Sequence, residues 1–187
     1  MTNQNIPKKI LYWYDNNKRS LPWRKKVSKN KKDYFTLVSE FMLQQTKVKT
    51  VIPYFEKFIK NFPNLKLLAR SSDHKILKNW EGLGYYSRAR NLKKTAIKLL
   101  KDYKGELPKD IEKLKSLPGI GEYTSRSILA IAHNKPYIPM DGNVERILKR
   151  VFLLKSNYEI SKENLNLKNF FLDFQKDQVI MHKQSWR

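Results

Sequence analysis

Two carboxylates in different surroundings are the residues of this chain that could carry out chemistry together. Glu40 lies in Ser39-Glu-Phe-Met-Leu-Gln-Gln-Thr46, where apolar neighbours cover nearly every face of a predicted helix, so we expect it in the interior or at a cleft wall. Burial raises the pKa of a carboxyl, which suits a general acid. Asp141 opens Asp141-Gly-Asn-Val144, ahead of another predicted helix. Such a pair fits N-glycosidic cleavage, in which one acid protonates the leaving base and one ionised carboxylate stabilises an oxocarbenium-like cation.

Both carboxylates also have ordinary structural interpretations. Glu40 could pair with a nearby arginine or reach solvent at the end of its helix. Asp141 precedes Gly-Asn, which is favourable turn chemistry, and it stands where an N-cap is expected. Asp141 can cap a helix and act on a substrate only if one of its oxygens is left to face a cleft. The residues alone leave these alternatives open.

The segment Leu117-Pro-Gly-Ile-Gly121 predicts a turn that can bind a phosphate. A helix that starts after such a turn presents unpaired backbone N–H groups and a partial positive charge. Gly119 and Gly121 allow unusual backbone angles and a close approach. Apolar residues on both sides, from Ile111 onward, predict a helix–hairpin–helix that holds the DNA backbone without reading sequence. The alternative is an ordinary glycine-rich connection between two helices.

The charge balance of the whole chain favours polyanions as partners. Its 187 residues hold 39 Lys and Arg against 17 Asp and Glu, a formal net charge of +22. The alternative is a general bias toward lysine that also covers plain solvated surfaces. The chain has no cysteine, which excludes disulfides, thiolate zinc sites and thiolate-held iron–sulfur clusters. No apolar run approaches the length needed to span a bilayer, so we expect a soluble intracellular protein.

The elements that must position these residues are predicted to be helices. Sustained alternation of apolar and polar residues is missing, whereas helical periodicity recurs, so we expect an all-α protein with about nine or ten helical segments. Ser72 is predicted to be an N-cap. One helix is predicted to bury an apolar stripe of Leu92, Ala96, Leu99 and Leu100. The rest of that helix carries Arg88, Lys93, Lys94, Lys98 and Lys101.

With these residues in place, the chain resembles the helix–hairpin–helix DNA glycosylase superfamily, and within it the adenine DNA glycosylase branch. The resemblance runs from about Ile10 to Leu154. It rests on Leu21-Pro-Trp-Arg24, Ser39-Glu-Phe-Met-Leu-Gln-Gln-Thr46, Val51-Ile-Pro-Tyr-Phe55, Trp80-Glu-Gly-Leu-Gly-Tyr-Tyr-Ser-Arg88, Leu117-Pro-Gly-Ile-Gly-Glu-Tyr-Thr124 and Asp141-Gly-Asn-Val144. The Leu-Gln-Gln-Thr and Gly-Leu-Gly-Tyr-Tyr segments distinguish this branch from endonuclease III.

The resemblance implies a role for each candidate catalytic residue. Glu40 corresponds to the acid that protonates adenine and later assists water. Asp141 corresponds to the aspartate that stabilises the sugar cation, with Asn143 beside it. Tyr123 stands where bifunctional relatives carry a lysine nucleophile, and a tyrosine cannot form a Schiff base. We therefore expect hydrolysis of the base without strand scission through an imine.

The resemblance also implies residues that enter the duplex near the lesion. Gln45 and one of Tyr85 or Tyr86 correspond to side chains that fill the emptied base stack, as base flipping requires. The sequence does not choose between the two tyrosines. The alternative is that Tyr85 and Tyr86 are core aromatics and that Gln45 is a helix surface residue.

The implied architecture is two helical lobes with a DNA-binding cleft between them. We expect a six-helix lobe over 33–133, and a second lobe from 1–32 and 134–187, with Glu40 and Asp141 facing each other. The expected partner is double-stranded DNA containing adenine mispaired with 8-oxoguanine or guanine, bound by a monomer. The expected location is the cytoplasm of a bacterium, in association with the nucleoid.

The chain also departs from the family pattern. The family continues into four cysteines that hold a 4Fe–4S cluster and then into a domain that reads 8-oxoguanine, whereas this chain has no cysteine. We therefore expect no cofactor, and a truncated, frame-shifted or naturally shortened chain whose second lobe is incomplete at its C-terminal end. The alternative functions are a mismatch glycosylase with another base preference and a non-catalytic DNA-binding remnant.

Overall fold

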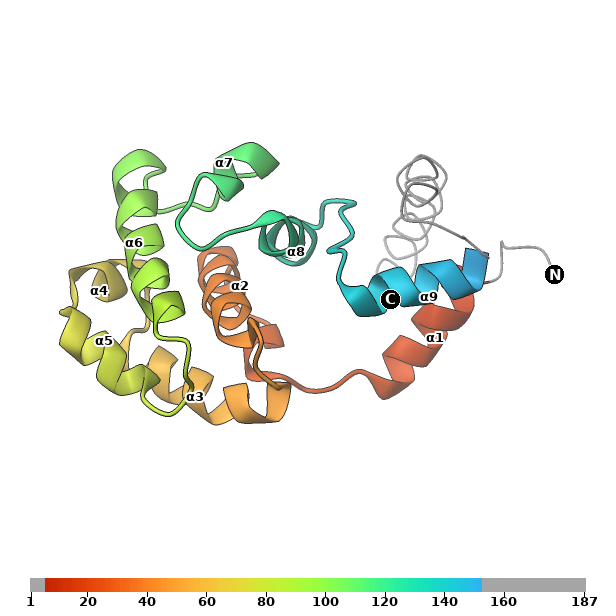
Figure 1. Ribbon diagram of the computed structural model, residues 1–187, viewed down its shortest axis with the longest axis horizontal. Coiled ribbons are helices and arrows are strands. Elements are labelled where there is room, and N and C mark those ends of the chain that lie inside the picture. Colours follow the sequence, from red (N-terminus) through yellow and green to blue (C-terminus); the bar gives the residue numbers. More distant parts are fainter. Residues whose placement is uncertain (1–5, 153–187) are drawn as a thin grey trace. The chain divides into compact units, whose positions relative to one another are not determined.

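The computed structural model describes residues 6–152, with side chains for residues 9–151. Over this range the backbone forms α-helices and one 3-10 helix and no strand, which confirms the predicted all-α class (Figure 1). In chain order the elements are α1 (Ile6–Asn17), η2 (Pro22–Arg24), α2 (Lys29–Leu43), α3 (Val48–Asn61), α4 (Leu65–Arg70), α5 (Asp73–Trp80), α6 (Ser87–Asp102), α7 (Ile111–Lys115), α8 (Glu122–His133) and α9 (Gly142–Phe152). Among the described residues no helix is long and apolar enough to cross a membrane.

Polar side chains start several of these helices. The side-chain oxygens of Asn64, Ser72 and Asp110 accept hydrogen bonds from backbone N–H groups three residues on, at 2.9, 3.3 and 2.9 Å. Each bond satisfies a donor that the first turn of a helix leaves without a partner. The predicted cap at Ser72 is thereby confirmed.

The chain divides into two compact units, one of Ser20–Pro139 and one of Met1–Arg19 with Met140–Arg187. The division predicted from the sequence placed 33–133 against 1–32 with 134–187. The Ser20–Pro139 unit holds η2 and seven α-helices, α2 to α8, because Asn64 and Ser72 start separate short helices. In its described part the other unit holds α1 and α9.

Helix α2 is the central element of the Ser20–Pro139 unit. It packs against η2, α3, α6 and α8 (Figure 1). Nine of its 15 residues are buried, as its apolar surroundings predicted. Phe41 and Met42 have no exposed surface, and burying a side chain of this size contributes about 2 to 3 kcal/mol. The helix that carries Glu40 is therefore held firmly on several sides.

Helix α6 shows where the predicted stripe was right and where it was wrong. Leu92, Ala96 and Leu99 are buried as expected, while Leu100 is 36% exposed. Arg88, expected on the polar side of this helix, is only 6% exposed. The first turn of α6 lies against the C-terminal end of α2, where unpaired carbonyls accept hydrogen bonds from the guanidinium. The arginine is therefore a buried bridging group and not a solvated one.

Candidate active site and phosphate-binding turn

Glu40 is a buried carboxyl at the contact between α2 and α8. Only 9% of the residue is exposed. Burial raises the pKa of its carboxyl, while a hydrogen bond from the Ser127 side chain on α8 and the positive charge of Arg24 lower it to smaller extents. Burial is thus the dominant influence on the pKa of Glu40, and the charge of Arg24 is a smaller one. A carboxyl in this state can give and take a proton nearer to neutral pH than an exposed one.

Asp141 caps α9, as its position before the helix suggested. Its Oδ1 accepts hydrogen bonds from the backbone N–H groups of Asn143 at 3.0 Å and Val144 at 2.8 Å. Its Oδ2 accepts a longer bond of 3.4 Å from the side-chain amide of Asn143, whose own oxygen accepts from Arg146 at 3.0 Å. One oxygen therefore carries the cap, and the other is oriented by Asn143.

The segment 117–121 forms the predicted turn between α7 and α8. Ile120 is buried and anchors the turn in the core. Two side chains of α6 fix the approach, since the Thr95 hydroxyl donates to the Pro118 carbonyl at 2.7 Å and Lys98 Nζ donates to the Ser116 carbonyl at 2.9 Å. The turn is therefore a supported helix–hairpin–helix element, with the N-terminus of α8 at its end.

The two glycines of this turn serve different purposes. Gly119 has φ of 77°, and a Cβ added there would lie 2.8 Å from both Cβ of Asn91 and Cε1 of Phe41. Gly121 is the N-cap of α8 with φ of −91°, and a Cβ there would meet nothing within 4 Å. Gly119 is thus required by the fold, whereas Gly121 leaves open space before the first N–H groups of α8, where an anion can approach.

Tyr123 follows in the first turn of α8 and is 43% exposed. A tyrosine at this position supplies a phenol and no amine. The side chain lies at the same end of α8 as the turn 117–121.

Gln45 and Tyr85 share an unusual backbone conformation. Both are exposed, and both have positive φ, 55° for Gln45 and 49° for Tyr85. Such angles are uncommon for residues with a Cβ and cost about 1 kcal/mol or more. Strained residues of this kind concentrate at functional sites when the surrounding structure holds them. The 60% exposure of Tyr85 excludes the alternative that it is a core aromatic.

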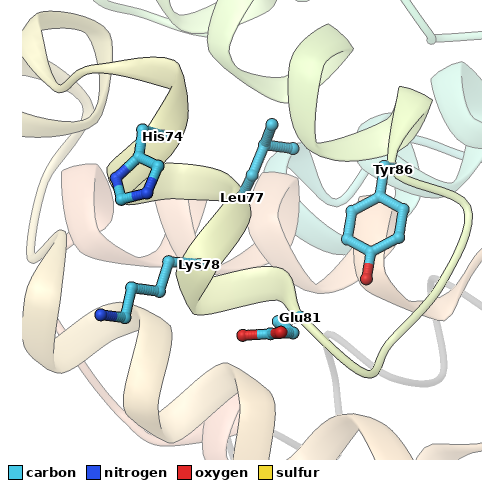
Figure 2. Close-up of a pocket in the computed structure, with 5 residues that line it drawn as sticks. All are labelled: His74, Leu77, Lys78, Glu81 and Tyr86. Atoms are coloured by element: carbon cyan, nitrogen blue, oxygen red, sulfur yellow. The ribbon is translucent and has the colours of Figure 1, made fainter.

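Tyr86 faces a different environment from Tyr85. Its ring borders a shallow pocket of about 400 Å³ that is otherwise lined by α5 and the residue after it, with His74, Leu77, Lys78 and Glu81 (Figure 2). Tyr86 is 40% exposed and therefore is not a core residue either. The two adjacent tyrosines are distinct in backbone conformation and in surroundings.

The candidate residues fall in both units. The Ser20–Pro139 unit holds Glu40, Gln45, Tyr85, Tyr86, Gly119, Gly121 and Tyr123. The other unit holds Asp141 and Asn143. The facing arrangement of Glu40 and Asp141 stays a prediction.

Sequence reasoning overlooked three residues of this region: Ser127, Gln44 and Arg88. Ser127 shows no local signal, because its partner Glu40 lies on another helix. Gln44 and Arg88 lie within two of the motifs that carry the resemblance. Arg88 was expected on the polar side of its helix, and neither residue was expected to take part in the site. Gln44 could have been found from its place at the C-terminal end of a predicted helix, whereas Arg88 shows no local signal, because it bonds to carbonyls of another helix.

The iron–sulfur cluster that the family implies does not fit the residues of this sequence. Such clusters are held mainly by cysteine thiolates, and the chain has no cysteine. The described residues also contain no group of three or more His, Asp or Glu side chains placed to hold a metal ion.

Comparison with known sequences gives a consistent set of matches. The sequence pattern described as "HhH-GPD superfamily base excision DNA repair protein" matches residues 38–169. The adenine DNA glycosylase of Buchnera aphidicola subsp. Acyrthosiphon pisum (strain APS) is 46% identical over 153 residues, covering 81% of this chain and 43% of the relative. The adenine DNA glycosylase of Rattus norvegicus is 44% identical over 147 residues, covering 76% and 28%. The chain spans less than half the length of these relatives.

Solved structures share the same fold. A thermostable thymine-DNA glycosylase superposes with a TM-score of 0.75 at 25% identity, covering 88% of this chain and 76% of that protein. Endonuclease III in a non-covalent DNA complex superposes with a TM-score of 0.72 at 20% identity, covering 94% and 83%. At this identity the second likeness concerns the fold alone.

Proposed function

The chain belongs to the HhH-GPD superfamily of base excision DNA repair proteins, and on that basis we propose that it removes adenine mispaired with 8-oxoguanine or guanine from double-stranded DNA. The observation that carries this proposal is Glu40, a buried carboxyl on the central helix with a raised pKa. The relatives named adenine DNA glycosylase, at 46% and 44% identity, favour adenine as the base.

Glu40 acts as the general acid in the proposed reaction. Its proton passes to a ring nitrogen of adenine while the N-glycosidic bond breaks, so the base leaves neutral and the sugar becomes an oxocarbenium-like cation. The resulting carboxylate then accepts a proton from the attacking water. The Ser127 hydrogen bond and the Arg24 charge stabilise this ionised form of Glu40 between the two steps.

Asp141 is the proposed ionised partner that stabilises the cation. Its cap bonds use mainly Oδ1, and the Asn143 amide orients Oδ2. Tyr123 has no amine to attack the sugar, so the product is an abasic site in an intact strand.

Gln45 and Tyr85 are the proposed wedge that fills the space left by the flipped base. Tyr85 is favoured over Tyr86 because it is more exposed and shares the positive φ of Gln45, whereas Tyr86 borders the pocket beside α5. The helix–hairpin–helix turn binds a backbone phosphate at Gly121, and the protein acts on one duplex as a monomer.

Alkali treatment of a labelled duplex tests the proposal directly. The protein is incubated with duplexes containing adenine opposite 8-oxoguanine, adenine opposite guanine, or thymine opposite guanine, and the products are resolved with and without hot alkali. We expect strand breaks only after alkali and only in the adenine duplexes. Breaks before alkali would contradict the monofunctional mechanism, and breaks in the thymine duplex would indicate another base preference.

Two variants connect the result to the proposed residues. Glu40→Gln and Asp141→Asn should each lower the rate of base release by at least about 100-fold while the protein still binds the duplex. Base release at the rate of the unmodified chain in either variant would overturn the assigned role. If the unmodified chain binds DNA in a salt-sensitive manner but releases no base, it is a DNA-binding remnant.

A further inference from the structure

Arg88 makes an unusual number of bonds for one buried side chain. Seven oxygen acceptors on two short segments lie within hydrogen-bonding distance of its guanidinium, and its five N–H groups are shared among them. Arg88 is 6% exposed, and no carboxylate is among these seven partners. Burying a cation is costly unless it is fully hydrogen-bonded. The acceptors on the two segments offset this cost for Arg88, and the guanidinium in turn links the two segments.

The first segment is the end of α2 and the turn after it. The two N–H groups of Arg88 Nη1 are shared among four acceptors, which are the carbonyls of Phe41 at 3.3 Å, Met42 at 2.8 Å and Gln44, and Thr46 Oγ1 at 3.1 Å. A helix leaves its last carbonyls unpaired and negative, so a cation there is doubly favourable. Arg88 therefore caps the helix that carries Glu40.

The second segment is the loop between α5 and α6. Arg88 Nη2 donates to the carbonyls of Leu83 at 3.2 Å and Gly84 at 3.1 Å, and Nε donates to that of Tyr85 at 3.4 Å. The guanidinium also lies 5.3 Å from the centre of the Tyr85 ring and 5.6 Å from that of Trp80. Hydrogen bonds and cation–π contacts together hold this loop.

Each of the two segments carries one of the four described, exposed residues other than glycine that have positive φ. The remaining two, Lys104 and Asn134, lie within two residues of the C-terminal ends of α6 and α8. Gln45 follows the Gln44 carbonyl, and Tyr85 itself supplies a carbonyl to Arg88. Neither conformation is favoured locally. One guanidinium therefore holds both strained residues at a fixed separation.

Gln44 extends the connection to the phosphate turn. Its side-chain amide donates to the Gly119 carbonyl at 3.2 Å and to Thr124 Oγ1 at 3.4 Å. Its backbone carbonyl accepts from Arg88. A continuous set of hydrogen bonds thus runs from the loop 82–86 through Arg88 and Gln44 to the turn 117–121.

We propose that Arg88 is a positioning residue that sets the distance between the Gln45 and Tyr85 wedge residues, and that Gln44 fixes this pair relative to the phosphate turn. The proposal rests on the proposed function, because the wedge matters only if a base is flipped. Arg88 touches no base. Its effect on base release is to hold the residues that occupy the stack.

Lysine cannot replace arginine in this role. A lysine keeps the charge but has three donors on one nitrogen, whereas the guanidinium has five donors spread over a rigid plane. Arg88→Lys can reach one segment and must release the other. Arg90→Lys is the matched control, since Arg90 is two residues further along α6 and is exposed.

Three measurements on the full chain test the proposal: amide hydrogen exchange without DNA, affinity for an undamaged duplex, and the single-turnover rate of adenine release at saturating protein. In Arg88→Lys we expect faster amide exchange in both 43–46 and 82–86 and a duplex affinity within about 3-fold of the unmodified chain. The rate of adenine release should be lower by about 30- to 100-fold, because a small misplacement of positioning residues costs about this much in rate. Arg90→Lys should change none of the three.

The outcomes separate a positioning role from general destabilisation. Faster exchange throughout α2 and α6, or a parallel loss of affinity and rate, would reduce Arg88 to a structural residue and overturn the proposal. The proposal would also be overturned if Arg88→Lys showed faster amide exchange in both segments but an unchanged rate of adenine release. If Arg88→Lys does not fold, Gln44→Ala tests the proposal in its place. This variant should speed amide exchange in 43–46 and around Gly119, leave the amides of 82–86 protected, and lower the rate of adenine release. An unchanged rate in that variant would also reject the proposal.

Failure of the proposed function gives a different pattern. If the unmodified chain releases no adenine, the proposed function fails, while hydrogen exchange still reports whether Arg88 joins the two segments. If the unmodified chain is active and Arg88→Lys is equally active, only the positioning role fails.

Discussion

Glu40 shows how burial can serve a reaction and weaken the fold at once. Its pKa is raised from the ordinary value of 4.5 chiefly by burial. Between the unfolded and the folded pKa, the native state binds more protons than the unfolded state, so stability falls as pH rises through this window. The penalty is absent below about 4.5 and complete above the folded pKa. Neutral pH lies above the unfolded value of 4.5, so the protein carries at least part of this penalty there.

Replacement of Glu40 by glutamine should separate the two effects. Glu40→Gln keeps the shape and removes the charge, so the melting temperature at pH 7.5 should rise by at least about 2 °C, the shift that roughly 1 kcal/mol produces in a chain of this size. The gain should disappear on acidification below about 4.5. Adenine release should fall by at least about 100-fold, the usual share of general acid catalysis. Differential scanning fluorimetry across pH and single-turnover assays measure the two quantities.

Glu56→Gln is the control for this pair of measurements, because Glu56 is an exposed residue of α3. It should change neither the melting temperature nor the rate. In the unmodified chain the release rate should decline as pH rises through the raised pKa of Glu40. A melting temperature that drops in Glu40→Gln at pH 7.5 would show that the charge is compensated within the fold.

Individual residues differ in how well the sequence predicts them. The burial of Glu40 could be predicted because apolar residues surround it on its own helix. The role of Arg88 could not be predicted, because four of its seven partners come from the end of α2 and the turn after it, more than 40 residues away in the chain. Local periodicity placed Arg88 with the lysines of α6, and a tertiary contact reversed that. The positive φ of Gln45 and Tyr85 likewise has no signal in their residue types.

At the scale of elements, the helix–hairpin–helix is a turn whose two glycines can be tested separately. Gly119→Ala must place a methyl group against Asn91 and Phe41 at a φ of 77°. We expect a loss of roughly 2 to 4 kcal/mol in the free energy of unfolding, from the positive φ and the overpacking together. Gly121→Ala has open space and an ordinary φ, so its stability should change by less than about 0.5 kcal/mol.

The two glycine variants should rank in the opposite order in DNA affinity: among the molecules that are folded, Gly121→Ala should bind the duplex more weakly than Gly119→Ala. A methyl group at Gly121 stands in front of the N–H groups that start α8, so Gly121→Ala should weaken duplex binding by at least about 5-fold, or roughly 1 kcal/mol. Urea unfolding and fluorescence anisotropy with a labelled duplex give both quantities. A Gly121→Ala protein that binds like the unmodified chain would show that no phosphate sits at this turn.

The elements themselves followed from the sequence more reliably than their side-chain contacts. The Ser72 cap, the turn at 117–121 and the apolar face of α6 each depend on residues close together in the chain, and each is present. Helix ends could be located from caps and glycines for the same reason. The connections between elements, such as Thr95 to Pro118, depend on packing that no local pattern specifies.

For the whole molecule, the net charge of +22 is the property that governs how it meets DNA. Phosphate contacts by lysine and arginine release counterions, so affinity falls steeply as salt rises. This attraction does not depend on the base pair that is mismatched. In the proposed function it supplies encounter and general affinity, whereas Glu40 and the proposed wedge residues, Gln45 and Tyr85, decide which base is removed.

The salt dependence of binding should therefore be the same for matched and mismatched duplexes. If about four phosphates are contacted, the logarithm of the association constant should fall with a slope of about −3.6 against the logarithm of salt, or roughly 150-fold between 50 and 200 mM. A duplex with adenine opposite 8-oxoguanine should shift the line upward without changing its slope, because the added contacts are to bases and not to phosphates. Fluorescence anisotropy over this salt range measures both lines. A steeper slope for the mismatched duplex would mean that the flipped complex recruits further cations to the backbone, and the wedge would then not be the main source of discrimination.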